Sequence, residues 1–306
     1  MNDSKKTSAE FRVLSSFESG KPYFLWDFPG VDCVQELEYQ WHKKGKLKAV
    51  VRVAIQKDGK AVSSPGLPFG GIWIFGSIHT DELTQFVDRF VLDLKNRGLS
   101  SLFLTQPPKP YEPFTDLIQS VLLKKGFVQT SVFSHQFFLG KKKIKEEAQN
   151  LKEKLKSQKN DLRLTSYRGQ IMNFKFLQEI RNWNNERGYA FNLDEKRVIE
   201  QVSVFPERYF QISIFKNDHP IAHAMAVKLV PEGMYYFLSA ISPSAKVPNC
   251  GDLILLNLFQ LAAEQKSEFI DLGSSEIESG INHGLMFFKS RFSNDISNKV
   301  TWNLRF

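Results

Sequence analysis

The sequence predicts an α/β protein built from two copies of one unit, each a mixed β-sheet flanked by helices. Three observations carry this prediction. The first two are an order of hairpin, strand, helix and strand that occurs twice, and a length of 306 residues, which suits two domains. The third is composition, since 42% of the residues are hydrophobic and 24% are charged, enough apolar surface for a buried core. A disordered or fibrous chain is therefore excluded.

Each copy begins with a hairpin. Residues 51–62 and 210–221 alternate apolar and polar side chains on both sides of a turn. The turns fall at Asp58-Gly59 and at Asn217-Asp218, residue types that accept tight-turn conformations. A further apolar strand follows each hairpin, at residues 71–75 and 235–241.

A helix and a second strand complete each copy. In the first copy, apolar residues at helical spacing occupy 83–94, with Thr80 as the expected N-cap and Gly98 as the glycine that ends the helix. In the second copy, the helix spans about 251–263 and is apolar on nearly all sides, which predicts a helix buried on most of its surface. Short apolar strands follow the two helices, at residues 99–104 and 268–272.

The two copies predict domains at residues 1–140 and 161–306. Between them, residues 141–160 contain eight Lys and three Glu, with their few apolar residues at helical spacing. We expect a basic helix that connects the domains, and the alternative is a nucleic-acid contact. Residues 300–306 alternate strictly and predict a last strand that closes the second domain.

Charge, hydropathy and cysteine content predict the cellular compartment of the protein. Part of the net charge of +8 is local to the basic helix. No apolar stretch approaches the roughly 20 residues needed to span a bilayer, and no hydrophobic segment follows the polar N-terminus. Cys33 and Cys250 cannot form a disulfide framework, which suits a reducing compartment. These features predict a cytoplasmic protein without a transmembrane segment.

Several common catalytic motifs are absent from the sequence. It contains no phosphate-loop motif, no H-E-x-x-H, no G-x-S-x-G and no G-x-G-x-x-G after a strand. The six histidines are scattered, apart from His219 and His223, which fall in a strand pattern. We therefore expect no metal site and no bound cofactor.

The loop before the second long helix is a first candidate site. Asn249, Gly251 and Asp252 lie where backbone N–H groups of a helix start favour an anion such as a pyrophosphate. A glycine also allows close approach of a ligand, so we expect a ligand to bind at this loop. The alternative is an ordinary turn in which Asp252 serves the helix start.

A second candidate follows the strand at 268–272. Asp271 ends this buried strand before Gly-Ser-Ser, a place where α/β sheets carry chemistry, and it either orients a nucleophilic amine or caps the loop. Lys289 and Arg291 follow an apolar turn and could hold a phosphate or carboxylate. Alternatively, both are surface charges beside a core Phe288.

These two tracts resemble a known family. Residues 270–275, I-D-L-G-S-S, and 284–292, G-L-x-F-F-K-x-x-F, resemble the C-terminal signature of the Fem-type peptidoglycan aminoacyltransferases and their FemAB-like relatives. Weaker similarity extends over residues 60–71, 102–108 and 125–127. The resemblance implies two tandem GNAT-like (acetyltransferase-like) domains, in agreement with the internal duplication.

The resemblance also implies an activity and a set of site residues. The activity is transfer of an acyl or aminoacyl group to an amine, with aminoacyl-tRNA as donor and a muramyl-peptide cell-wall precursor as acceptor. The resemblance makes Lys289 the cation of the polar site and Phe288 its packing neighbour, and it places Asp271, Gly273, Asn249 and Gly251 near the acyl donor. We therefore predict Lys289, Asp271 and His283 as catalytic residues, with His283, Tyr235 or Tyr236 as the candidate base. The predicted donor-binding residues are Asn249, Gly251, Asp252 and Gly273, so that the second domain holds the acyl-donor end, and the predicted substrate-binding residues are Phe288, Tyr236 and Arg291.

Two other functions remain open from the sequence. One is an acyl-CoA-dependent N-acyltransferase, with the coenzyme A phosphates at residues 249–252. The other is a non-catalytic member that binds RNA or an acyl carrier through its basic helix. The transfer itself requires an amine held near an ester or thioester carbonyl and donors for the developing oxyanion, so the sequence need not contain a dedicated base.

Overall fold

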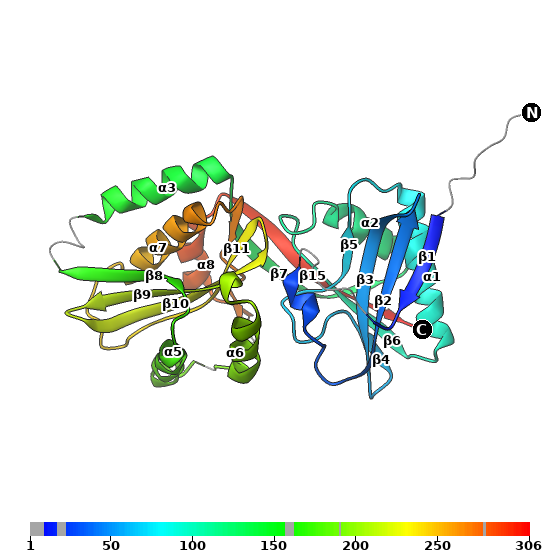
Figure 1. Cartoon of the computed structure of the whole chain (residues 1–306), viewed down its shortest axis with the longest axis horizontal. Coiled ribbons are helices and arrows are strands. Elements are labelled where there is room, and N and C mark those ends of the chain that lie inside the picture. The colour runs from blue at the N-terminus through cyan, green and yellow to red at the C-terminus, as the bar shows by residue number, and fades with distance from the viewer. Residues whose placement is uncertain (1–8, 17–22, 157–161, 190, 278–279) are drawn as a thin grey trace, which may run out of the picture. The chain divides into compact units, whose positions relative to one another are not determined.

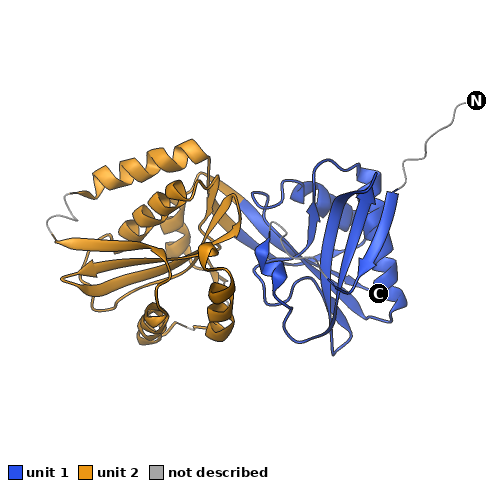
Figure 2. Ribbon diagram, viewed as in Figure 1, with its two compact units in different colours: residues 1–134, 297–306 blue, residues 135–296 orange. Residues whose placement is uncertain are grey.

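The computed structural model describes residues 9–16, 23–156, 162–189, 191–277 and 280–306. The chain divides into two compact units (Figure 2): unit 1 is residues 1–134 with 297–306, and unit 2 is residues 135–296. The polar N-terminal start and positions 157–160 of the expected connector lie outside the described residues.

Unit 1 is a mixed sheet covered by helices. Its strand order is β1-β2-β3-β4-β6-β15, and β5 pairs with β3. Only β4 and β6 pair in parallel among these neighbours. The strands are β1 (Ala9–Leu14), β2 (Cys33–Lys43), β3 (Lys46–Gln56), β4 (Lys60–Val62), β5 (Ile72–Ile74), β6 (Ser101–Gln106), part of β7 (Val128–Leu139) and most of β15 (Asp295–Arg305). The helices are η1 (Phe24–Asp27), α1 (Thr80–Asn96) and α2 (Thr115–Lys124).

The core of unit 1 forms between α1, α2 and one face of the sheet. The apolar stripe of α1, with Leu83, Phe86 and Phe90, is fully buried against strand residues such as Leu102 and Trp302. This is the packing that the helical spacing of residues 83–94 predicts. The helix begins one residue earlier than expected, so that His79 and not Thr80 is the N-cap, and it ends before Gly98 at φ +76°.

Unit 2 is a second mixed sheet with helices on both faces (Figure 1). Its strand order is β7-β12-β11-β10-β9-β8, in which only β11 and β12 pair in parallel. The strands are β8 (Leu164–Gln170), β9 (Tyr209–Lys216), β10 (His219–Val230), β11 (Gly233–Ile241) and β12 (Phe269–Asp271), with a separate small pair, β13 (Glu276–Ile277) and β14 (Gly280–Ile281). The helices are α3 (Lys141–Lys154), α5 (Lys175–Glu186), α6 (Glu195–Val204), η2 (Pro206–Arg208), α7 (Cys250–Glu264) and α8 (His283–Ser290).

Helix α7 lies at the centre of the unit 2 core. It packs against the strands on one side and against α3 on another, where Ile144 and Leu151 are buried with Phe259 in one cluster (Figure 1). Helices α5 and α6 lie on the other face of the sheet (Figure 1). A helix covered by both a sheet and a second helix has almost no solvent face, which explains the nearly continuous apolar sequence of α7.

The structure confirms the predicted fold class and the repeated order of elements. Hairpin, strand, helix and strand appear as β3-β4, β5, α1 and β6 in unit 1. They appear again as β9-β10, β11, α7 and β12 in unit 2.

Two expectations about the domains need correction. The last strand does not close the second domain, because Val300–Arg305 pair with β6 and their apolar face lies in the core of unit 1. Residues 141–154 do not form a connector, because α3 lies within unit 2 and buries its apolar stripe with α7. The chain passes between the units through β7 and β15, each of which has residues in both.

Candidate active site

Strands β11 and β12 part at the end of β12. They pair only from Gly233 with Phe269 to Tyr235 with Asp271, after which β12 ends and β11 continues alongside β10. Beyond this point β11 carries one extra residue, Phe237, as a bulge against β10. Bulges bend a strand and increase its twist, so the bulge helps to turn β11 away from the end of β12.

Asp271 holds His135 in a fixed orientation at this point. Both residues are buried, and the His135 Nδ1 atom lies 3.1 Å from each carboxylate oxygen of Asp271. The carboxylate only accepts, so Nδ1–H donates to it and Nε2 is left as the acceptor nitrogen. That Nε2 is buried and has no hydrogen-bond partner among the described residues. The pair can therefore accept a proton at His135 Nε2.

The turn after β12 brings a lysine and a tyrosine to the same place. The Gly273 N–H donates to Asp271 Oδ1 at 2.7 Å, and φ at Gly273 is +74°, a conformation that favours glycine. A Cβ atom added at Gly273 would lie 3.7 Å from Lys289 Nζ and 3.8 Å from Tyr235 Oη. Asp271, His135, Gly273, Tyr235 and Lys289 are named the polar cluster below.

Lys289 is buried, with an exposed fraction of 6%, and its Nζ donates to the Ser274 carbonyl at 2.5 Å. Burial lowers the pKa of Lys289 to about 8, against the opposing effect of the Asp271 and Glu276 charges. An amine with this pKa is mostly protonated at neutral pH and can gain or lose its proton near pH 8. Burial and the Asp271 charge raise the pKa of Tyr235, so its phenol stays protonated.

Helix α8 positions Lys289. Its N-cap Asn282 accepts a hydrogen bond from Leu285 N at 2.9 Å, which fixes the start of the helix. Lys289 and Phe292 then turn inward, whereas Phe287 is 71% exposed.

A second group of predicted residues lies where α8 meets the start of α7. A Cβ atom added at Gly251 would lie 2.9 Å from Phe288 Cζ, so this glycine allows the Phe288 ring to pack against α7. Arg291 donates to Asp252 at 3.1 Å, and its guanidinium lies 5.2 Å from the centre of the Phe288 ring. Asn249 precedes this turn at φ +52° and is exposed.

The structure thus places seven of the ten predicted site residues in two groups. Asp271, Gly273 and Lys289 belong to the polar cluster. The second group contains Gly251, Asp252, Phe288 and Arg291, and α8 carries residues of both groups. His283 is exposed at the start of α8, and Tyr236 packs against the unit 2 core, where burial raises its pKa to about 12.

His135 is the residue that the sequence does not single out. It lies on β7, far from Asp271 in sequence, and no motif surrounds it. Only the antiparallel pairing of β7 with β12 brings the two side chains together. In the part of the chain that the structure describes, no three His, Cys, Asp or Glu side chains are grouped as metal ligands, and no helix is long and apolar enough to cross a membrane.

Comparison with known proteins identifies the fold. No protein-family model matches the chain, and a search of curated proteins finds no related sequence. Among solved structures, FemX is similar with a TM-score of 0.63, 12% identity and coverage of 88% of this chain and 87% of that chain. A tandem GNAT protein from the clavulanic acid biosynthesis pathway is similar with a TM-score of 0.56 and 10% identity, over 97% of this chain and 98% of that chain.

A third similar structure is the C-terminal domain of a protein assigned as a lysylphosphatidylglycerol synthetase from Agrobacterium fabrum. Its TM-score is 0.53 at 14% identity, over 84% of this chain and 81% of that chain. The chain therefore has the fold of a tandem GNAT protein, with two mixed α/β units. The fold implied by the Fem-type resemblance is confirmed, and identities at this level speak to the fold alone.

Proposed function

We propose that this protein is a transferase that moves an acyl or aminoacyl group onto an amine, with its chemistry at the polar cluster of unit 2. The observation that carries the proposal is a buried amine, Lys289, beside an oriented His135–Asp271 pair at the end of β12. The similarity to FemX and to a tandem GNAT protein supports it at the level of fold. The Fem-type motif over residues 270–292 adds support from the sequence.

The residues of the polar cluster suit the steps of such a transfer. The acceptor nitrogen bonds to the donor carbonyl carbon, the C–O or C–S bond to the leaving group breaks, and one proton passes from the amine to the leaving group. Protonated Lys289 stabilises the oxyanion that develops on the carbonyl oxygen. His135 Nε2 accepts the amine proton, and Asp271 stabilises the imidazolium that results.

The donor that we propose is an aminoacyl-tRNA, with acyl-CoA as the alternative. Helix α3 supports a polyanionic donor, because seven exposed lysines follow it from Lys141 to Lys156 on the unit that carries the cluster. The predicted donor residues Asn249, Gly251 and Asp252 lie at the start of α7, against which α3 packs. Since Phe288 covers Gly251, Asn249 and Arg291 are better placed to contact a donor than Gly251 is. The acceptor that we propose is an amine such as that of a muramyl-peptide precursor.

The test is a transfer assay read by mass spectrometry. The protein is incubated with amine acceptors, including muramyl peptides, and with either charged tRNA or a series of acyl-CoA thioesters. Product from charged tRNA supports the aminoacyl donor, and product from thioesters alone supports the acyl-CoA alternative. Lys289→Met should lower the rate of product formation by about 10²–10³-fold. The matched control is Lys228→Met, which removes another partly buried lysine of unit 2 that donates to a carbonyl, at Gln265.

A folded protein that yields no product with any donor, yet binds RNA, would indicate the non-catalytic alternative. A second experiment addresses the RNA directly. Reversing Lys152, Lys154 and Lys156 to Glu should weaken charged-tRNA binding and flatten its salt dependence, since each phosphate contact releases counterions. Unchanged binding by the triple variant would remove α3 from the donor site.

A further inference from the structure

Strand β7 holds helix α8 through a buried side chain, Gln136, that lies outside the polar cluster. Gln136 is 2% exposed, and its Nε2 donates to the Met286 carbonyl at 3.2 Å. Met286 precedes Lys289 by three residues on α8, and residues at this spacing are neighbours on one side of a helix. The Gln136 amide therefore fixes the backbone of α8 about one turn before the lysine.

The backbone of Gln136 holds the turn that follows β12. The Leu272 N–H donates to the Gln136 carbonyl at 2.8 Å, and the Gln136 N–H donates to the Gly273 carbonyl at 3.3 Å. These two bonds extend the pairing of β7 with β12 beyond Asp271. His135 is the preceding residue on β7. Gln136 thus connects the turn at Gly273, helix α8 and the strand position of His135.

The orientation of the Gln136 amide is fixed at a cost. Exchange of its two ends would bring its oxygen against the Met286 carbonyl oxygen, so the donation to Met286 determines which way the amide points. The Gln136 Oε1 atom is then buried, and it has no hydrogen-bond partner among the described residues. An apolar side chain of similar size would avoid the cost of that buried atom. The bond to α8 is therefore what an amide adds at this position.

Other contacts hold the two ends of α8. Before the helix, the Asn282 N–H donates to the Ser275 carbonyl at 2.8 Å. After the helix, the Asn294 side chain accepts from Leu139 N at 2.7 Å and donates to Leu139 O at 3.0 Å. These contacts attach the ends of α8 to unit 2, whereas Gln136 bonds to the helix itself beside its buried lysine.

We propose that Gln136 is a positioning residue, which holds the Lys289 amine in place relative to the His135–Asp271 pair. Its role in transfer rests on the proposed function, in which the lysine stabilises the oxyanion and His135 accepts the proton. Both groups must reach the same reacting centre, and a displacement of about 1 Å can lower a rate by about 10²-fold. Loss of the bond to Met286 leaves α8 free to shift, and the lysine shifts with it.

The protonation of Lys289 reports its position. Burial lowers the pKa of Lys289 to about 8, whereas the Asp271 and Glu276 carboxylates act in the opposite direction. When α8 shifts outward, water reaches the amine and this pKa rises toward the ordinary 10.5. The pKa can be measured without any substrate, so it tests the position of the lysine separately from transfer.

The test compares two variants that each replace a side-chain amide by an apolar group of similar size. Gln136→Met removes the bond to Met286 on α8. The matched control, Asn294→Leu, removes two bonds to the Leu139 backbone of β7 and leaves α8 itself untouched. Gln136→Asn, whose amide is one methylene too short to reach Met286, is a second variant with the same expectation as Gln136→Met. Circular dichroism verifies that each variant is folded.

The first measurement is an NMR titration of the full chain with ¹³C at the lysine Cε atoms. The Lys289 signal is the one that is missing from Lys289→Met. We expect a pKa of about 8 for Lys289 in the parent and in Asn294→Leu, and a higher pKa in Gln136→Met. The second measurement is transfer kinetics. For Gln136→Met, kcat should fall by about 10–100-fold with KM changed by less than about threefold, and Asn294→Leu should stay within about twofold of the parent.

Two results would overturn the proposal. One is a Lys289 pKa that is the same in the Gln136 variants as in the parent, which would make Gln136 a structural residue only. The other is an equal change in Asn294→Leu, which would mean that any loosening of this region moves the lysine. A raised pKa with an unchanged kcat, or a parent that transfers nothing, would instead contradict the proposed function, and the titration would still decide whether Gln136 positions Lys289.

Discussion

The two units of this protein use the same structural position in different ways. In each unit, the strand that follows the long helix ends on a fully buried polar side chain, Gln106 on β6 and Asp271 on β12. The Gln106 amide accepts from Ile72 N at 3.0 Å and donates to Ile72 O at 2.8 Å. The Gln106 side chain thereby makes the two hydrogen bonds to the Ile72 backbone of β5 that the backbone of a neighbouring strand would make. Asp271 instead binds His135 and the turn at Gly273.

The end of this strand therefore has a structural role at Gln106 in unit 1 and is a candidate for chemistry at Asp271 in unit 2. Gln106 satisfies a strand residue on both sides, and a Cβ atom at Gly71 would lie 2.5 Å from its Oε1, so the fit is tight. Asp271 lies in a cluster that contains a buried amine at Lys289 and a His135 nitrogen that has no hydrogen-bond partner among the described residues. Burying such groups costs stability, and proteins keep them mainly where function needs them.

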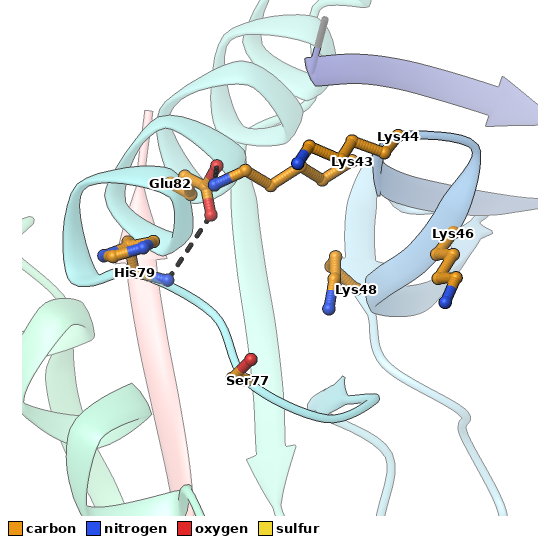
Figure 3. Close-up of a pocket in the computed structure, with 7 residues that line it drawn as sticks. All are labelled: Lys43, Lys44, Lys46, Lys48, Ser77, His79 and Glu82. Carbon is orange, nitrogen blue, oxygen red and sulfur yellow. Dashed lines mark hydrogen bonds and ion pairs between the residues drawn. The ribbon is translucent and has the colours of Figure 1, made fainter. Parts of the chain in front are cut away.

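The starts of the two long helices, α1 and α7, also differ between the units. In unit 2, the Phe288 ring covers Gly251 at the start of α7, and Arg291 pairs with Asp252. In unit 1, Glu82 in the first turn of α1 lines a cavity of about 270 Å³. One duplicated unit therefore carries the candidate chemistry, and in the other unit the start of the long helix borders a cavity lined by four lysines (Figure 3).

Replacement of Lys289 by Met is the strongest test of this division. If Lys289 stabilises the developing charge, Lys289→Met should lower the transfer rate by about 10²–10³-fold. The free energy of unfolding should change by less than about 2 kcal/mol, because the loss of the bond to Ser274 is offset by removal of a buried charge. Single-turnover rates and urea denaturation measure the two effects. A large loss of stability with an unchanged rate per folded molecule would assign Lys289 a structural role.

Replacement of Gln106 tests the other half of the comparison. Gln106→Leu leaves the N–H and the carbonyl of Ile72 without their partner in a buried place. The free energy of unfolding should fall by about 2–6 kcal/mol, at about 1–3 kcal/mol for each unsatisfied group. The transfer rate per folded molecule should stay the same. A rate that fell while stability held would mean that unit 1 also takes part in the reaction.

Glu112 makes unit 1 sensitive to pH. Its buried carboxylate accepts from Ile74 N and Phe114 N, at 2.8 and 3.0 Å, yet burial raises its pKa to about 7 from an ordinary 4.5. Between these pH values the folded protein keeps a proton that the unfolded chain has lost, so stability falls as pH rises. The fall should reach about 3 kcal/mol and be absent from Glu112→Gln, as measured by urea denaturation at a series of pH values. A variant with the same pH slope as the parent would exclude this assignment.

The fold was largely predictable because its signals are local. Alternating residues around Asp58-Gly59 and Asn217-Asp218 define the hairpins, and helical spacing defines α1 and α7. The unit to which the last strand belongs was not predictable, because the apolar face of residues 300–306 could pack on the core of either unit. The packing of α3 on α7 was also not predictable, because the helical spacing of apolar residues in α3 shows that one face is buried but not which element buries it.

The candidate site was predictable only where its residues fall in one motif. Asp271, Gly273 and Lys289 lie within about twenty positions of one another, and the structure brings them together. His135 enters the site through pairing of β7 with β12, a long-range contact without a sequence signal. Gly251 was interpreted as room for a ligand, whereas the ring that fills that space belongs to Phe288.

His223 gives unit 2 a pH response of opposite sign to that of Glu112. Its Nε2 lies 2.7 Å from Glu179, its Nδ1 lies 2.7 Å from Ser213 Oγ, and Trp183 stacks on the ring at 5.1 Å. Burial lowers the pKa of His223 below its ordinary 6.5, although the Glu179 carboxylate opposes this effect. The unfolded chain therefore binds the proton first as pH falls, so this contribution to stability is complete above pH 6.5 and is lost below it.

We expect this loss of stability below pH 6.5 to be the smallest of the four predicted effects. It should disappear in the His223→Gln variant. Glu179→Gln should make it steeper, because removal of the carboxylate lowers the pKa of His223 further. Urea denaturation of the parent and both variants, at pH values on either side of 6.5, measures the difference. If the parent became more stable relative to His223→Gln as pH fell, the imidazole would be charged in the folded protein. The bond to Glu179 would then outweigh burial, and the two units would no longer differ in the sign of their response.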